Sequence, residues 1–255
     1  MALITTATIN NDLNASTSDL VTGVAVGATA FIYNTSDDTG QDTLALGKND
    51  SLLTTLKIYD SNDDWQVQFN SNTDTVQADR ISDGSFAGDD TIKFTAVDGR
   101  AGIRYLGERD GYFVYADMTV RTGVKALGLK DREGTVNDDA IAGSGVADGF
   151  FYDTALGLNL GNDTITAFAA NDRLVTTTEI FDSNGDGKIN FSGNKAVDLP
   201  GDVGNESGSG NELGGIASLT DMSGKLITAL YLVDTDVVNG VTYYQYGTTP
   251  LPLDA

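Results

Sequence analysis

The sequence contains no cysteine and no histidine, and it has only three prolines and one tryptophan. Without cysteine and histidine, the chain has no thiol nucleophile, no zinc site of the usual kind and no histidine-based catalytic triad. It also has no disulfide to tie its loops together. In acidic, loop-rich chains a bound ion such as calcium is the usual substitute, so these absences direct attention to hard-cation sites.

Basic residues are also scarce. Lys and Arg together number 15 against 37 Asp and Glu, which gives a formal net charge of −22 at pH 7. So acidic a chain is repelled by nucleic acids and by anionic membrane surfaces, and neither is expected as a partner. Only five of the acids are Glu. Because Asp prefers turns, caps and hard-cation sites, its excess predicts many loops, some of which bind metal.

Long apolar runs are missing as well. The N-terminal segment MALITTATINND has no basic region and no apolar core, and no apolar run reaches the length of a membrane span. We therefore expect no cleaved signal peptide and no transmembrane segment. Such a protein is either cytosolic or exported by a route that reads something other than the N-terminus. With 255 residues, 40% of them hydrophobic, the chain can bury the core of one large domain or of two ordinary ones.

The most informative stretch is DSNGDGKINF at 182–191, which places Asp182, Asn184 and Asp186 at alternate positions before Gly187. Calcium takes six to eight oxygens at about 2.3–2.6 Å, and a tight loop with side-chain oxygens at its first, third and fifth positions supplies three. Glycine at the next position allows the sharp turn that such a loop needs. The sequence therefore predicts a calcium-binding loop.

Two further ligands are predicted in this loop, the backbone carbonyl of Lys188 and the side chain of Asn190, the latter directly or through water. An EF-hand would place a bidentate Glu at the twelfth position, where this chain has Gly193. The loop is therefore not an EF-hand between two helices, and the remaining ligand must come from elsewhere. The alternative interpretation is a hairpin turn without metal, because Asp, Asn and Gly are common turn residues.

The loop has a twin at 60–69, DSNDDWQVQF, in which Trp65 stands where the second loop has Gly187. Its candidate ligands correspond to those of the second loop and are Asp60, Asn62, Asp64 and Gln66. For the missing ligand we predict Asp172, which recurs as Asp50 in the first copy. Because a side chain at the Trp65 position resists positive φ, the loop at 182–190 is expected to bind calcium more tightly.

The similarity extends well beyond the loops. Residues 40–62 match 161–184, residues 20–35 match 140–154, and residues 103–117 match 228–247, all in the same order. This order predicts a tandem duplication, with a first module at 1–122 and a second at 123–255.

Both copies have the pattern of β structure. Apolar and polar residues alternate at 91–95, 112–115 and 241–246, and Gly, Asn and Asp interrupt the chain at short intervals. One short helix is predicted at 212–219. We therefore predict an all-β protein of two tandem, similar β modules, each a sandwich or a short β-roll-like structure with calcium-binding loops.

The start of the second copy resembles the end of the RTX (repeats-in-toxin) calcium β-roll and the serralysin-type module that follows it. A Gly-rich turn containing Asp leads to an aromatic strand, then to two strands that open on Asp-Thr-Ile and Asp-Arg-Leu. The matching residues are Gly143, Gly145, Asp148, Phe150, Phe151, Asp163, Thr164, Ile165, Phe168, Asp172, Arg173 and Leu174. The chain departs from the family in having at most one imperfect turn per copy, with Val146 where a glycine is expected. A continuous calcium ladder is therefore not predicted.

The resemblance implies export by type I secretion with an uncleaved C-terminal signal, and folding outside the cell on meeting calcium. No enzymatic role follows, since the zinc helix of serralysins needs histidine. We expect a secreted structural protein at the bacterial cell surface or in the extracellular matrix. Copies of the chain would assemble into a filament, surface layer or biofilm matrix through a repeated contact. The alternative is a calcium-dependent adhesin or carbohydrate-binding module without assembly, whose partner would be cell-surface polysaccharide.

Overall fold

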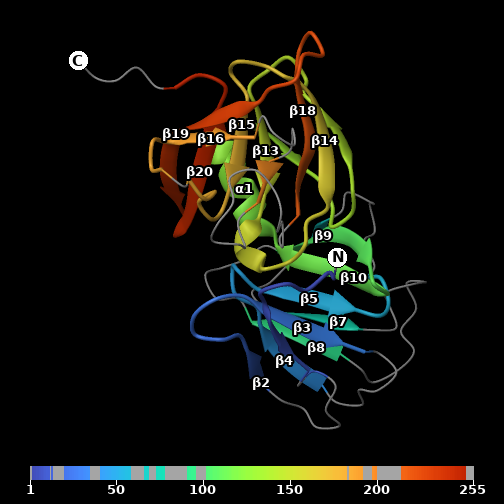
Figure 1. Ribbon diagram of the computed structural model, residues 1–255. Helices are drawn as coiled ribbons and strands as arrows, with labels where there is room; N and C mark the ends of the chain where they lie inside the picture. The colour runs from blue at the N-terminus through green and yellow to red at the C-terminus, as the bar shows by residue number, and fades with distance from the viewer. Residues whose placement is uncertain are drawn as a thin grey trace. The chain divides into compact units, whose positions relative to one another are not determined.

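A computed structural model describes residues 2–11, 13, 20–34, 41–58, 66–68, 73–77, 91–95, 102–182, 184–191, 197–199 and 214–250 (Figure 1). Strands in several sheets dominate the described chain, beside one α-helix, which agrees with the all-β prediction. It divides into two compact units, residues 2–119 and residues 120–255. Within the described residues, no helix is long and apolar enough to cross a membrane.

The first unit contains two sheets whose early strands alternate along the chain. The strand order of the larger sheet is β1 (Thr8–Asn10), β3 (Thr29–Tyr33), β5 (Ser51–Thr54), β10 (Tyr112–Asp117), β9 (Gly102–Arg109) and β6 (Gln66–Gln68). The order of the smaller sheet is β2 (Leu20–Thr22), β4 (Gln41–Ala45), β8 (Thr91–Thr95) and β7 (Thr73–Gln77). β1, β3 and β5 pair in parallel, as do β2, β4 and β8. The chain therefore coils between two parallel sheets, as in a β-roll, before antiparallel strands extend each sheet.

The second unit has the same strand order, with every strand number ten higher. Its larger sheet runs β11 (Lys130–Glu133), β13 (Asp148–Tyr152), β15 (Arg173–Thr176), β20 (Val241–Gly247), β19 (Ala229–Val238) and β16 (Lys188–Asn190). Its smaller sheet runs β12 (Ala140–Ala142), β14 (Asn162–Phe168), β18 (Gly215–Asp221) and β17 (Val197–Asp198). The hairpins β9–β10 and β19–β20 turn at Asp110-Gly111 and Asn239-Gly240, whose residues all have φ > 0. Tight two-residue hairpin turns require that backbone geometry.

Burial explains which strands show an alternating pattern in the sequence. All five residues of β13, DGFFY, are buried, and so are the four of β5, SLLT. A strand that is covered on both faces has no solvent-facing side, so neither of these strands shows an alternating pattern of burial. The three segments predicted from alternation, at 91–95, 112–115 and 241–246, lie in β8, β10 and β20. In β20, buried and half-buried residues alternate at its start.

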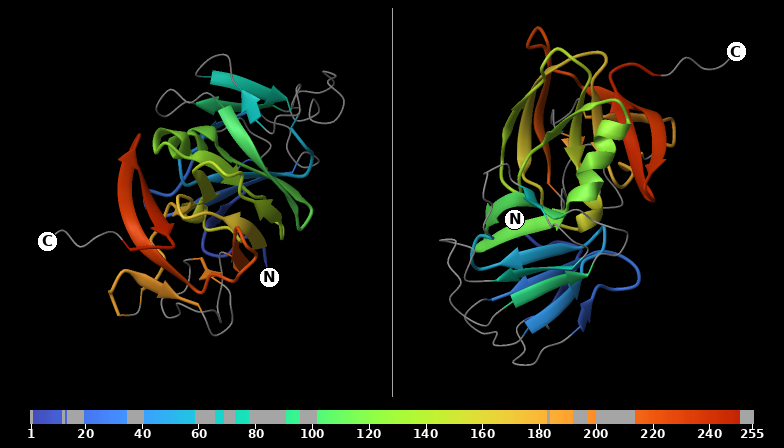
Figure 2. Two further views of the ribbon diagram at one scale, coloured as in Figure 1. Left: turned by 90° about the horizontal axis from the view of Figure 1, so that it is seen from above. Right: turned by 180° about the vertical axis from the view of Figure 1, so that it is seen from behind.

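The prediction of a helix at 212–219 is wrong, since β18 covers Gly215–Asp221 and pairs with β14. One α-helix is present among the described residues, α1 (Met118–Ala126). Asp117 caps it, because its Oδ1 accepts the backbone N–H of Thr119 at 2.6 Å. Val120 and Val124 pack into a core cluster of the second unit, and α1 lies along that unit's strands in the right-hand view of Figure 2.

Candidate functional site

The loop predicted to bind calcium lies between two anchored segments of the second unit. On its N-terminal side, the backbone N–H of Ile180 donates to the hydroxyl of Tyr246 at 2.8 Å, in the core. On its C-terminal side, β16 pairs with β19, and Ile189 and Phe191 are buried. At the joint between loop and strand, the carbonyl of Gly187 accepts the N–H of Leu232 at 2.8 Å. The ends of the loop are therefore fixed by the core, while its tip is exposed.

Asp182 organises the first half of the loop. Its Oδ1 accepts the N–H of Asn184 at 3.2 Å and that of Gly185 at 2.9 Å, and its Oδ2 accepts the N–H of Gly187 at 2.6 Å. Gly185 and Gly187 have φ values of 69° and 74°. Residues with a Cβ rarely adopt these angles, so the two glycines allow the chain to wrap around the Asp182 carboxylate.

The other two predicted side-chain ligands continue the pattern. Asn184 Oδ1 accepts the N–H of Asp186 at 3.0 Å, and Asp186 Oδ1 accepts the N–H of Lys188 at 2.8 Å. The Asn184 amide donates to Asp186 Oδ2 at 3.2 Å, so these two side chains lie together. The loop thus brings two carboxylates and one amide carbonyl into six consecutive residues. Asn184 and Asp186 are exposed, whereas the predicted ligands Lys188 and Asn190 lie in β16 and are half-buried.

Across the described part of the chain, no group of three or more His, Cys, Asp or Glu side chains is arranged to hold a metal ion. The loop offers only two acidic side chains, so any metal bound there must also take neutral oxygens, from Asn184 and from backbone carbonyls. A hard cation such as Ca²⁺ accepts such oxygens, whereas a soft metal prefers nitrogen and sulfur ligands. The chemistry of the donors therefore restricts the candidates to hard cations.

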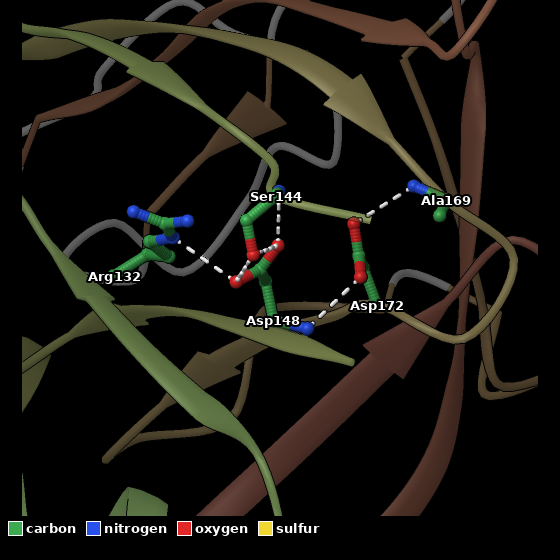
Figure 3. Close-up of polar contacts among 5 residues, drawn as sticks. All are labelled: Arg132, Ser144, Asp148, Ala169 and Asp172. Atoms are coloured by element: carbon green, nitrogen blue, oxygen red, sulfur yellow. Dashed lines mark hydrogen bonds and ion pairs between the residues drawn. The ribbon is translucent and has the colours of Figure 1, made fainter. Parts of the chain in front are cut away.

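Asp172 and Asp50, predicted as the missing ligands, have the same surroundings in the two units. Asp172 is buried; its Oδ1 accepts the N–H of Asp148 at 2.9 Å and its Oδ2 accepts that of Ala169 at 2.8 Å (Figure 3). Asp50 accepts the N–H of Thr29 at 3.0 Å and that of Gly47 at 2.6 Å. Each carboxylate therefore connects its own turn to the preceding coil. Their role as calcium ligands stays a prediction.

The preceding turn of the second unit contains another buried aspartate, Asp148. Its carboxylate accepts the backbone N–H and the hydroxyl of Ser144, and Arg132 Nε donates to it at 3.0 Å (Figure 3). Burial opposes the charge on this group, but the hydrogen bonds from Ser144 and Arg132 and the positive charge of Arg132 outweigh it and lower the pKa of Asp148. This carboxylate is thus held in its charged form.

In the smaller sheet of the second unit, the buried aspartate Asp163 has a pKa shifted in the opposite direction to that of Asp148. Asp163 is buried and accepts the N–H of Asp139 at 2.8 Å and the hydroxyl of Tyr152 at 2.7 Å. Asp138 in turn accepts the N–H of Asn162 at 2.8 Å. Burial raises the pKa of Asp163 to about 7; the two hydrogen bonds oppose this rise, and the nearby Asp139 and Asp138 carboxylates add to it.

These turn aspartates were missed as a group in the sequence, although a signal was present. The dipeptide Asn-Asp precedes a strand at 49–50 and 171–172, opens a strand at 162–163, and recurs as Asn-Asp-Asp at 137–139. In the second unit the backbone hydrogen bonds accepted by Asp138, Asp163 and Asp172 each span 24 residues. That spacing is the length of one coil, so each such aspartate links a turn to the equivalent turn of the neighbouring coil.

Most of the first loop lies outside the described residues, including Asp60, Asn62 and Asp64. The backbone of Gln66 opens β6 and pairs with Arg104 of β9. The chain entering this loop is anchored as in the second unit, because the N–H of Ile58 donates to the buried hydroxyl of Tyr115 at 2.7 Å. A tyrosine hydroxyl thus anchors the chain just before each predicted loop.

Comparisons with protein-family models, with curated proteins and with solved structures found no match for this chain. The resemblance to the RTX family therefore stays a prediction that rests on the residues named above.

Proposed function

We propose that this protein is a calcium-binding structural protein, secreted to the bacterial cell surface or extracellular matrix, where copies of the chain assemble. The observation that carries the proposal is the loop at 182–187. Three side-chain oxygens at alternate positions are gathered on an exposed turn, two left-handed glycines shape that turn, and β16 and Tyr246 hold its ends. A hairpin turn that binds no metal does not require this combination of residues.

We further propose that the two units arose by tandem duplication and that each carries one calcium loop. Support comes from the identical strand order of the units and from matched contacts. Thr54 and Thr176 each donate a hydroxyl to the carbonyl two residues later, in addition to the paired roles of Asp50 and Asp172 described above. Two modules of this kind explain why the loop sequence occurs twice.

Calcium would act on folding through the net charge. A chain with a formal charge of −22 repels itself in the compact state, and each bound Ca²⁺ cancels two negative charges. Binding to the folded state alone stabilises it by about 2.7 kcal/mol per site when calcium is at a hundredfold excess over Kd. Two sites would then contribute about 5 kcal/mol, comparable with the stability of many domains. Low calcium inside the cell would leave the chain loose and exportable, and millimolar calcium outside would fold it.

The metal site is tested by calorimetry on Asp186→Ala, with Asp221→Ala as the matched control. Asp221, the half-buried last residue of β18, also accepts backbone N–H groups, from Ser223 and Lys225, but it has no alternating ligand pattern around it. We expect Asp186→Ala to lose calcium affinity and Asp221→Ala to keep it. Asp64→Ala should lose less affinity than Asp186→Ala, because Trp65 stands where the second loop has Gly187. Equal calcium binding by Asp186→Ala and the unmodified protein would refute the site.

Folding and assembly are tested by circular dichroism and light scattering during a calcium titration followed by chelation with EGTA. We expect β structure to form first and scattering to rise afterwards. A chain that is equally folded and equally assembled in EGTA would refute the role of calcium. Electron microscopy of the calcium-loaded protein distinguishes filaments or a lattice from dispersed particles, and dispersed particles that bind polysaccharide would favour an adhesin.

A further inference from the structure

Among the described residues, the first coil of the first unit ends in two strands that each have a neighbouring strand on one side only. β1 and β2 each stand at the end of their sheet, and within the described residues β1 pairs with β3 and β2 with β4. In Figure 1, β2 lies at the margin of this unit beside β4. Outward backbone N–H and C=O groups on such an edge can pair with another strand, and natural proteins usually protect them with charged side chains.

In the equivalent coil of the second unit, one of the two edge strands, β11, has that protection, while the other, β12, carries no charge. All four residues of β11, Lys130 to Glu133, are charged. Arg121 forms ion pairs with Asp131 and Glu133, and Arg132 pairs with Asp148. A strand that approached this edge would have to displace these pairs and face their charges, so β11 is a poor template for pairing.

The first coil of the first unit lacks such protection. Its described residues, 2–11, 13 and 20–34, include no charged side chain, although the chain carries −22 overall. The nearest acids in the sequence, Asp12 and Asp19, lie outside the described residues. The coil also exposes large apolar side chains, with exposed fractions of 54% for Ile9, 69% for Leu20 and 91% for Val26. Val21, between Leu20 and Thr22, is buried, so this apolar surface lies on the outer side of a strand that packs normally on its inner side.

We propose that the uncharged edges of β1 and β2 are a self-association site, where two copies of the chain pair these edges antiparallel about a two-fold axis. Charge favours a second copy of the chain over a basic partner at this edge. Two copies at −22 repel each other at their acidic surfaces, and an uncharged, apolar edge lets them approach without that cost. A basic partner would instead be attracted to the acidic surfaces. Around a two-fold axis the same patch serves both copies, so like surfaces meet.

This inference rests on the proposed function and locates one of its contacts. An isologous contact closes on itself, so it produces dimers; a filament or lattice needs a second, different contact as well. The pairing would be that of strand addition, with backbone hydrogen bonds giving affinity and the exposed Ile9 and Leu20 side chains giving apolar contact.

The test compares two substitutions of equal charge and equal exposure. Leu20→Glu places a carboxylate on the edge, and Val237→Glu places one on β19 of the second unit, where the exposed fraction is also 69%. Sedimentation velocity at several protein concentrations, in calcium and in EGTA, measures association, while circular dichroism checks that both variants keep their β structure. We expect a concentration-dependent dimer for the unmodified protein and for Val237→Glu, and an association constant at least about tenfold lower for Leu20→Glu. Ile9→Glu, on the other open edge, should weaken the dimer too and replaces Leu20→Glu if that variant fails to fold.

The outcomes separate this inference from the proposed function. Assembly in calcium that Leu20→Glu and Ile9→Glu leave unchanged would overturn the edge contact and keep the proposed function. A dimer that Leu20→Glu abolishes, but that forms equally in EGTA, would support the edge contact and overturn the role of calcium in assembly. A monomer at every concentration, or equal weakening by Val237→Glu, would overturn the self-association site.

Discussion

The buried carboxyl of Asp163 makes the stability of the second unit depend on pH in a direction opposite to that of most carboxylates. Asp163→Asn is the perturbation that reveals this. An asparagine at this position has nearly the same shape, keeps one oxygen to accept the N–H of Asp139, and places an amide that can donate to the oxygen of Tyr152. It has no proton to lose, so the variant removes the titration and preserves the hydrogen-bonding site.

The magnitude follows from the pKa of Asp163, which burial raises from 3.8 to about 7. Because the folded state holds this proton more tightly than the unfolded chain does, the carboxyl's contribution to stability is fully present below the unfolded pKa. It is lost as the pH rises through the folded pKa. A pKa difference of about 3 at about 1.4 kcal/mol per pH unit corresponds to about 4 kcal/mol. Asp163→Asn should therefore gain up to about 4 kcal/mol over the unmodified protein between about pH 4 and about pH 8.

Urea unfolding followed by circular dichroism in EGTA, repeated across this pH range, measures the difference between the two proteins. Asp148→Asn is the matched control, because the pKa of Asp148 is lowered. Its carboxylate contributes stability above the unfolded pKa and loses it as the pH falls through the folded value, so this variant should differ most from the unmodified protein at neutral pH, as a loss. A stability difference for Asp163→Asn that stays constant with pH would refute the assignment of a raised pKa to this group.

Three further substitutions test the loop and its supports. In Gly187→Ala the added Cβ has no atom within 4 Å, but the alanine must adopt a φ of 74°, which costs about 1–2 kcal/mol. Calorimetry should therefore show a calcium affinity about tenfold lower. Unchanged affinity would contradict this expectation. Asp172→Ala leaves one buried and one half-buried backbone N–H donor, of Asp148 and Ala169, without their acceptor. It should cost about 2–5 kcal/mol in urea unfolding, whereas a cost within error would exclude the link between coils. Tyr246→Phe removes the acceptor of the Ile180 N–H and should cost about 1–3 kcal/mol, with Tyr115→Phe as its counterpart in the first unit; thermal unfolding at the original midpoint would argue against both anchors.

Alternation in the sequence was sufficient to predict three strands, β8, β10 and β20. β20 begins with alternating buried and half-buried residues because one face of the hairpin is open, and that alternation is a local property of the chain. The partners of a strand are not local. All residues of β13 are buried, and β11 and β15 pair with it along its two edges. The same buried segment would suit an antiparallel sandwich equally well. The parallel coil therefore emerges only from the pairing.

The helix was misplaced for a related reason. The sequence of α1, MTVRTGVKA, contains Thr, Val and Gly, which are weak helix formers. Its position is set by the Asp117 cap and by the packing of Val120 and Val124. Its glycine, Gly123, has a packing role, since a Cβ there would lie 2.1 Å from the Tyr243 hydroxyl oxygen. Tertiary contacts thus override propensity in α1, and they do so again at 212–219, where pairing with β14 makes a strand.

Asp172 shows why recurrence alone does not reveal a role. It was predicted as a metal ligand because Asp50 matches it in the other copy, yet both carboxylates accept a backbone N–H from the preceding coil. A residue that holds coils together must recur in every unit that has coils, whether or not the unit binds an ion. The residues that differ between the units are more informative about function. Gly187 against Trp65 distinguishes the two loops, and the charged β11 against the uncharged β1 distinguishes the two open edges. If the residues common to both units form the scaffold and the differing positions carry the activity, then substitutions at the common residues should lower stability in both units. Exchanging the differing residues should instead move calcium affinity or self-association from one unit to the other.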